Sequence, residues 1–258
     1  MICLWYSRQS MNKPKAKNYF EPDILLVHKP VGISSFDVIR RLRVILGIRK
    51  IGHAGTLDPL AHGLMIVGIG TGTKKLTDYL KQDKTYIAEI LVGKSTTTGD
   101  LEGEIVKEVY VEKTDMNSSN IEMELIHMKG SHTLQVPLYS AIKVQGKALY
   151  AYARAGQKPP YIPEKEMNIK SIQYMDDYRS GKYHIIQVRL NVSSGSYIRT
   201  LGEEFGRRVG YPATLKGLYR ISIGEHLDKN AYHFPSRKKP YHGIVRAIIE
   251  LLFGKKSK

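Results

Sequence analysis

The sequence has almost no cysteine: Cys3 is the only one among its 258 residues. A single thiol cannot form an internal disulfide, and it leaves no cysteine cluster for a zinc site. Long apolar runs are also missing. No segment approaches the roughly 18 residues of a membrane-spanning helix, and the apolar run at residues 2–6 is shorter than the core of a signal peptide. We therefore expect a cytoplasmic protein with no membrane partner.

Acidic residues are scarce as well. Aspartate and glutamate number 24 against 40 lysines and arginines, which gives a formal net charge of +16. Such an excess favours a polyanionic partner, with nucleic acid first and an anionic membrane surface second. The hydrophobic fraction of 42% and the charged fraction of 25% are typical of a globular protein with a sizeable core.

The order of predicted elements divides the chain into a central globular part and two basic tails. Residues 1–22 lack periodicity and are predicted to be an N-terminal tail, within which Met11 is an alternative start. Residues 234–258 are predicted to be a C-terminal tail with a short helix at 244–253. Between the tails, strands and helices alternate irregularly, so we expect an α+β fold with much antiparallel pairing. The predicted strands are 24–28, 64–69, 86–92, 105–111, 185–192 and 218–223, with 86–92 and 105–111 forming a hairpin; the predicted helices start near 35, 73, 120, 147 and 197.

The most unusual segment is the glycine-rich stretch at residues 52–64, GHAGTLDPLAHGL. Its glycines suit a tight backbone, and Pro59 stiffens the position after Asp58, so the loop can hold a carboxylate at a fixed place. In isolation an Asp-Pro pair more often forms an Asx-type turn. His53 and His62 flank the aspartate, but their spacing and the lack of a third ligand do not favour a metal site. The glycine-rich run at 68–74 lacks the glycine that a phosphate loop needs before its lysine.

This segment closely resembles the catalytic motif of the TruB family of pseudouridine synthases. Five further segments resemble motifs of that family in the family's order, across about residues 24–224. They are KPVGISS at 29–35, DKTY at 83–86 with TTTGD at 96–100, QVP at 135–137 with YSAIK at 139–143, SGSYIRTL at 194–201, and the Leu-x-Arg signature at Leu218 and Arg220.

The resemblance implies a pseudouridine synthase fold, a mixed and mostly antiparallel central sheet flanked by helices, over residues 23–233. It also implies the catalytic groups. Asp58 corresponds to the family's catalytic aspartate and is expected to act as the nucleophile. Arg199 is expected to hold it ionised through two hydrogen bonds. Tyr86 is expected to stack on the flipped uracil and to help remove the C5 proton.

Other positions correspond to substrate contacts of the family. Tyr197 and Leu218 are expected to line the uracil pocket, His53 to contact the RNA loop, Asp100 to hydrogen-bond within the site, and Lys29 to support the loop or bind a phosphate. Residues 129–165 resemble the family's RNA-clamping insertion. The expected RNA contacts are Lys143, Lys147, Arg154 and Arg220.

By the same resemblance we expect a stand-alone, monomeric enzyme that isomerises the T-loop uridine at position 55 of tRNA. It would bind the T-arm stem–loop and need no cofactor, metal, guide RNA or protein partner. An RNA-binding module without chemistry is the alternative, which the presence of Asp58, Tyr86 and Arg199 together disfavours. Two departures from the family pattern are visible: the insertion motif at 135–139 is one residue short, and the residues after 224 do not resemble the family's C-terminal PUA domain.

Overall fold

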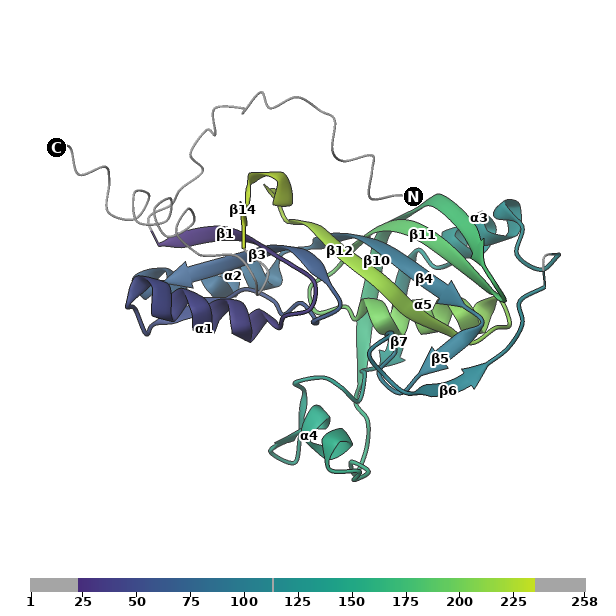
Figure 1. Cartoon of the computed structure of the whole chain (residues 1–258), viewed down its shortest axis with the longest axis horizontal. Helices are drawn as coiled ribbons and strands as arrows, with labels where there is room; N and C mark the ends of the chain where they lie inside the picture. Colours follow the sequence, from purple (N-terminus) through teal and green to yellow (C-terminus); the bar gives the residue numbers. More distant parts are fainter. Residues whose placement is uncertain (1–22, 113, 235–258) are drawn as a thin grey trace.

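A computed structural model describes residues 23–112 and 114–234, which form one large sheet with flanking helices (Figure 1). The sheet has ten strands, and its main order is β14-β1-β3-β12-β4-β11-β10-β7. These strands are β14 (Tyr232–His233), β1 (Ile24–Lys29), β3 (His62–Ile69), β12 (Ala213–Ile223), β4 (Lys84–Val92), β11 (Tyr183–Val192), β10 (Glu164–Ser180) and β7 (Gly130–Gln135). Two short strands complete it: β2 (Ile51–His53) on β3 and β13 (His226–Leu227) on β12.

The sheet is mixed but mostly antiparallel. Within its described part, β1–β14 and β12–β3 are parallel pairs and the other strand pairs are antiparallel. The helices are α1 (Ser35–Leu46), α2 (Leu76–Lys81), α3 (Ser118–His127), α4 (Leu149–Arg154) and α5 (Ile198–Arg208), with 3-10 turns at Gly70–Lys74 and Asp228–Asn230. This architecture confirms the predicted α+β class.

Helix α1 begins and ends where the sequence predicts. The Ser34 side chain accepts the Asp37 amide, and the Asp37 carboxylate in turn accepts the Ser34 amide, which forms a capping box. Gly47 closes the helix at a φ of 65°, a left-handed conformation that glycine adopts without steric cost. Val38, Ile39 and Leu42 are buried on the inner face.

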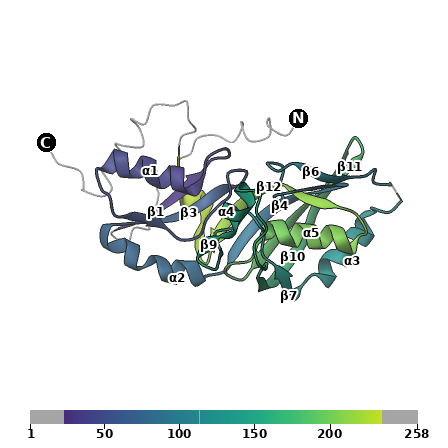
Figure 2. The same ribbon diagram turned by 90° about the horizontal axis from the view of Figure 1, so that it is seen from below.

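Strands β1 and β3 are buried on both faces, which explains their continuous apolar sequences. Alternate residues such as Leu25 and Met65 join the main core with α1, whereas Leu26 and Ile66 pack in a second cluster with Leu76 and Tyr79 around α2. Figure 2 shows α1 and α2 on opposite sides of these strands. The Asp58 loop, defined as residues 54–61, connects β2 to β3 and is therefore anchored in the most buried part of this half of the molecule.

The other half of the sheet is covered by α5 and α3. The alternating sequence of β4 predicts one inward face, and Tyr86, Ala88, Ile90 and Val92 on that face all belong to the main core. Helix α5 packs on β12 and β4, and α3 packs on β10. The start of α5 is thereby fixed against the sheet, and Ile198 and Leu201 are buried in that contact.

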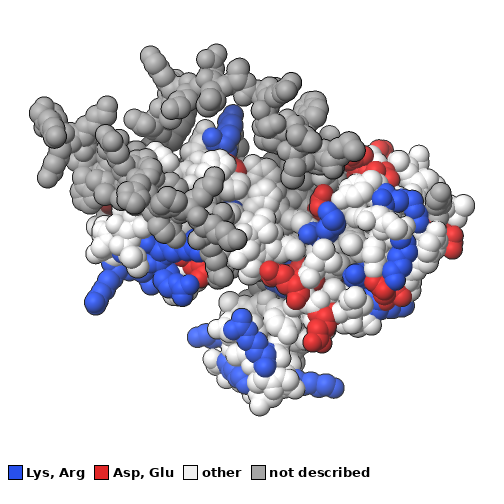
Figure 3. Space-filling view, in the orientation of Figure 1, with Lys and Arg blue, Asp and Glu red and all other residues white. Residues whose placement is uncertain are grey.

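The predicted insertion forms a small lobe that projects away from the sheet (Figure 1). It contains the hairpin of β8 (Lys143–Val144) and β9 (Lys147–Ala148), followed by α4. Val136, Val144 and Leu149 make its own small apolar core. Lysine and arginine side chains cover much of the visible surface of this lobe (Figure 3).

The predicted hairpin between 86–92 and 105–111 is wrong. Strand β4 lies between β11 and β12, and the true hairpin joins β5 (Lys94–Thr96) to β6 (Ile105–Glu108). The pattern also gave no prediction of β7 and β10. Their many charged and polar residues hide the period-two alternation that marks a strand. Strand β7 is at the edge of the sheet, and β10 pairs with it only over Glu164–Ile169.

Some helix ends differ from the predictions. The sequence predicts Ser118 or Ser119 as the cap of α3, but Asn117 is the cap. It predicts Ser196 as the cap of α5, but that helix begins at Ile198 without a side-chain cap. The predicted N-terminal tail with the alternative start at Met11, and almost all of the predicted C-terminal tail with its helix, lie outside the described residues. In the part of the chain that the structure describes, no helix has both the length and the apolar character to cross a membrane.

Candidate active site

The buried side chain of Lys29 supports the Asp58 loop by a hydrogen bond to its backbone. The Lys29 side chain is completely buried, and its Nζ donates to the carbonyl oxygens of Ile33 at 2.7 Å, Pro30 at 3.0 Å and Pro59 at 3.4 Å. Burial lowers the pKa of Lys29 to about 8, although the Asp58 carboxylate opposes that change. Lys29 thus fixes the Pro59 carbonyl, directly after Asp58, and places a cation next to the loop.

A buried arginine holds the other end of the same loop. Arg220, on β12, is 1% exposed. Its guanidinium donates to the carbonyl oxygens of Leu64 at 2.7 Å, Gly55 at 3.1 Å and Thr56 at 3.4 Å. Gly63 allows the close approach of the two strands, because a Cβ there would overlap with the Arg220 carbonyl oxygen.

The structure corrects two predicted contacts. Arg220 was expected to bind RNA and Lys29 to contact substrate or a phosphate, but neither side chain reaches the surface. Their donors are used by backbone carbonyls of the loop and its flanks, so both are positioning residues. Two roles were expected for Lys29, support of the loop or binding of a phosphate, and its contacts are those of loop support.

The Arg220→Met variant is expected to lose about 3 kcal/mol of unfolding free energy. The change keeps a long side chain but removes the donors from three loop and strand carbonyls, of which that of Leu64 is buried. Urea unfolding measures the loss. Arg220→Lys, which retains the charge and one donor site, is expected to lose less. A Met variant as stable as the wild type would contradict this role.

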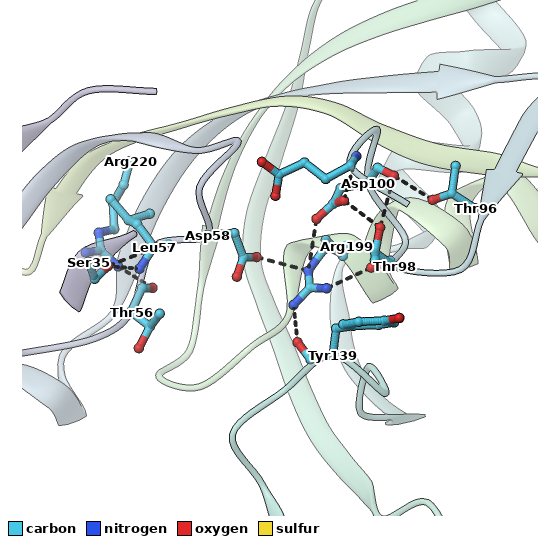
Figure 4. Close-up of polar contacts among 11 residues, drawn as sticks. Ser35, Thr56, Leu57, Asp58, Thr96, Thr98, Asp100, Tyr139, Arg199 and Arg220 are labelled. Atoms are coloured by element: carbon cyan, nitrogen blue, oxygen red, sulfur yellow. Dashed lines mark hydrogen bonds and ion pairs between the residues drawn. The ribbon is translucent and has the colours of Figure 1, made fainter. Parts of the chain in front are cut away.

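Asp58 and Arg199 form the centre of the site (Figure 4). The Arg199 Nε lies 3.0 Å from an Asp58 carboxylate oxygen; the arginine side chain is 6% exposed and the aspartate side chain 35% exposed. The other guanidinium nitrogens donate to the carbonyls of Thr98 at 2.7 Å and Tyr139 at 3.0 Å. The expected ion pair is therefore confirmed, but its expected two-hydrogen-bond form is wrong, since only Nε faces Asp58.

A second carboxylate faces the same guanidinium. Asp100 is buried, and one of its oxygens lies 3.9 Å from the Arg199 Nε. Its other oxygen accepts the Thr98 hydroxyl at 2.6 Å and the Glu102 amide at 3.0 Å (Figure 4). A cation near a helix N-terminus is disfavoured by the helix dipole, and two carboxylates offset that cost for Arg199 at the start of α5.

The electrostatic balance leaves Asp58 harder to ionise than a free aspartate. Burial raises its pKa above the ordinary 3.8, and Asp100 raises it further, whereas Arg199 and Lys29 lower it. Arg199 is the larger of the two lowering influences. The arginine thus counters the desolvation of the carboxylate, as the sequence predicts.

The residues expected to contact the uracil, by stacking or by lining its pocket, lie on or beside three elements of the fold. Tyr86 on β4 and Leu218 on β12 are buried in the main core, and Tyr86 lies opposite Arg220 in the sheet register. Tyr197 immediately precedes α5 and is half-buried. Burial raises the pKa of Tyr197, and both Arg199 and Asp58 act on it electrostatically, which places its hydroxyl within the same charged environment.

The insertion contacts the start of α5 directly. Its small core packs against Tyr197, and the Tyr139 carbonyl accepts from Arg199. Of the expected RNA contacts, Lys143 and Arg154 are exposed, whereas Lys147 is half-buried and lies 4.4 Å from the Tyr152 ring centre. The quoted motifs contain Thr98 and Tyr139 but assign no role to their carbonyls, because carbonyl acceptors carry no residue signature.

A cluster of rings lies on the sheet near the end of the Asp58 loop. His62 stacks on Tyr219 at 4.5 Å and on the other side lies 5.5 Å from His28, which stacks on His233 at 4.6 Å. Asp228 accepts from both the His28 ring at 2.7 Å and the Tyr219 hydroxyl at 2.8 Å. Among residues 23–112 and 114–234 no three histidine, cysteine or acidic side chains are arranged to hold a metal.

Acidification is expected to lower the stability of the fold through two histidines. Burial lowers the pKa of His53 and of His62 below the ordinary 6.5. As the pH falls below about 6.5, these histidines bind protons in the unfolded chain before they do so in the folded chain. The free energy of unfolding therefore decreases on acidification. Urea unfolding at about pH 7.5 and 5.5 measures this. His62→Phe keeps a ring against Tyr219 and should show the smaller loss; an equal loss would contradict the assignment to His62.

Comparison with known sequences identifies the family of this chain. A sequence model described as TruB family pseudouridylate synthase (N terminal domain) matches residues 43–198, more than half of the chain. A protein of Fusobacterium nucleatum named tRNA pseudouridine synthase B is 40% identical over 203 residues, which cover 79% of this chain and 68% of that protein. A protein of the same name from Bacillus anthracis is 36% identical over 87% of this chain and 74% of that protein. One from Bacillus subtilis is 38% identical over 78% of this chain and 65% of that protein.

Two solved structures share the fold at low sequence identity. The Cbf5-Nop10-Gar1 complex matches with a TM-score of 0.64 at 20% identity, over 92% of this chain and 57% of that one. An H/ACA RNP bound to a substrate RNA matches with a TM-score of 0.61 at 18% identity, over 89% and 54%. These structures share the fold, whereas the match to the family model and the named relatives show that this chain belongs to the TruB family of pseudouridylate synthases.

Proposed function

We propose that this chain isomerises the T-loop uridine at position 55 of tRNA to pseudouridine, with Asp58 as the nucleophile. The observation that carries the proposal is the Asp58–Arg199 ion pair of 3.0 Å, set in the rigid loop of a TruB-family chain. The Asp58 side chain keeps about a third of its surface exposed, so its carboxylate can meet a substrate while Arg199 stays buried behind it.

The reaction needs a nucleophile and a confined base but no oxidant or reductant. The N1–C1′ glycosidic bond breaks, the uracil turns, a C5–C1′ bond forms, the C5 proton leaves and N1 gains a proton. An ionised carboxylate can attack the nucleoside to start this sequence, and we assign that attack to Asp58. The bond that Asp58 forms breaks again before the product leaves, which regenerates the carboxylate. We assign stacking on the uracil and help with the C5 proton to Tyr86, and the walls of the pocket to Tyr197 and Leu218, which offset part of the cost of unstacking the base.

The substrate and partners follow from the relatives' names and from charge. The relatives are named as tRNA pseudouridine synthases, and a net charge of +16 suits a tRNA. In this proposal the insertion binds the T-arm stem–loop through Lys143, Lys147 and Arg154, and His53 contacts the RNA loop. The chain works as a cytoplasmic monomer without a cofactor, a guide RNA or a protein partner.

The test uses purified protein and unmodified tRNA transcript that carries tritium at C5 of uridine, with no cofactor added. Tritium release that approaches one equivalent per tRNA is expected. A transcript with cytidine at position 55 is the matched control and should release none. No release from the first transcript, or equal release from both, would overturn the proposal.

A further inference from the structure

One face of α1 and the turn after it carries a cluster of exposed cations. We call Arg40, Arg43, Arg49 and Lys50 the α1 basic face. The Arg40 side chain is 64% exposed, and Arg49 and Lys50 are also exposed. Arg43 lies over the exposed ring of Phe36, 5.8 Å from its centre. Figure 3 shows a group of lysine and arginine side chains on the side of the molecule where α1 lies.

The charge of this face is not balanced locally. The α1 basic face has four lysines or arginines, whereas residues 35–50 contain a single acidic residue, Asp37. One Asp37 oxygen accepts the amide and hydroxyl of Ser34, at 3.0 and 2.7 Å, and the other pairs with Arg40 at 2.6 Å. An ion pair this exposed is weak and exchanges readily with an external anion. The face therefore keeps a net positive charge.

Helix α1, which carries part of the α1 basic face, starts at the Asp58 loop. The Ser35 hydroxyl, at the first residue of α1, donates to the Leu57 carbonyl at 2.9 Å and accepts the Leu57 amide at 2.8 Å. Leu57 directly precedes Asp58. The 12 residues of α1 then extend roughly 18 Å from this contact. An RNA whose loop reaches Asp58 would have the insertion on one flank and the α1 basic face on another.

We infer that the α1 basic face binds the sugar–phosphate backbone of a second helical arm of the folded tRNA, beside the arm held by the insertion. Arginines presented with an exposed aromatic ring suit phosphates and sugars, and the chain contributes no base-reading element here. The inference rests on the proposed function and adds a binding surface to it. The contact would raise affinity for a complete tRNA but not for an isolated stem–loop.

The test compares two substrates and two triple variants. Arg40→Gln, Arg49→Gln and Lys50→Gln are combined, and Arg43 is kept because it also donates to the Ile51 carbonyl at 2.9 Å. Relative to wild type, kcat/KM on full-length tRNA is expected to fall about tenfold, and the log–log salt slope by about 2. On the isolated T-arm stem–loop, kcat/KM and the salt slope of this triple variant should both stay near the wild-type values. The matched control combines Lys107→Gln, Lys129→Gln and Lys229→Gln, all exposed and distant from α1 in sequence.

Each other outcome has a definite meaning. An unchanged rate on full-length tRNA, or an equal loss on both substrates, would overturn the inference. So would an equal loss in the control triple, because net charge alone would then explain the effect. Failure of the wild-type protein to isomerise either substrate would instead reject the proposed function, which keeps the two failures distinguishable.

Discussion

Asp58→Asn is expected to lose isomerisation by about 10⁴-fold or more while it binds tRNA with nearly wild-type affinity. Asparagine has the size and shape of aspartate, so the Asp58 loop keeps its contacts to Lys29 and Arg220. Its amide is not a nucleophile, so the covalent step fails. Single-turnover rates and filter binding on the same tRNA transcript measure the two quantities separately.

The stability of this variant provides the control. Burial raises the pKa of Asp58 above its ordinary value, so the ionised carboxylate lowers the stability of the fold at neutral pH. Replacement by a neutral amide removes that cost, and the free energy of unfolding at pH 7 should not decrease. A variant that stays active would contradict the role of Asp58, whereas wild-type protein that binds tRNA but does not isomerise it would favour the RNA-binding module.

Arg199→Gln is expected to lower kcat by about 10²–10³-fold and to move the acid limb of the pH profile to higher pH. Arg199 is the main group that lowers the pKa of Asp58, and Asp100 raises it. Without the guanidinium, burial and Asp100 raise the pKa of Asp58 further, and of the two cations only Lys29 still opposes them. Asp58 is then protonated at a higher pH, and activity falls off earlier on acidification.

Arg199→Lys separates charge from geometry. Lysine keeps the cation near Asp58 but cannot donate at once to the Thr98 and Tyr139 carbonyls that fix the guanidinium. The acid limb of the pH profile of Arg199→Lys should lie closer to that of the wild type than the limb of Arg199→Gln does, while kcat stays reduced. An acid limb that does not move in Arg199→Gln would contradict the electrostatic role of the arginine, even if the rate fell.

Local signals predict much of this fold. The Ser34 cap and Gly47 define α1 because capping is decided within a few residues. The alternation from Tyr86 to Val92 identifies the inner face of β4 for the same reason. The partners of β4 could not be predicted, since β11 and β12 lie far along the chain and pairing depends on packing of the whole sheet.

The sequence indicated candidate residues of the site, but apart from the Asp58–Arg199 ion pair it did not indicate their contacts. The motif around Asp58 and the resemblance at Arg199 anticipated the ion pair. Burial of Lys29 and Arg220 was not anticipated, because a cation in sequence is most simply interpreted as a surface residue that binds phosphate. Their true partners are backbone carbonyls, which every residue possesses, and so only the fold identifies them.

The most direct test of the central claim is to map pseudouridine along an unmodified tRNA transcript after incubation with the wild-type chain and with Asp58→Asn. Carbodiimide modification followed by primer extension gives the position at single-nucleotide resolution. We predict a single stop, at position 55, with the wild-type protein and no stop with the variant. A product at another uridine, no product, or the same product with Asp58→Asn would contradict the account.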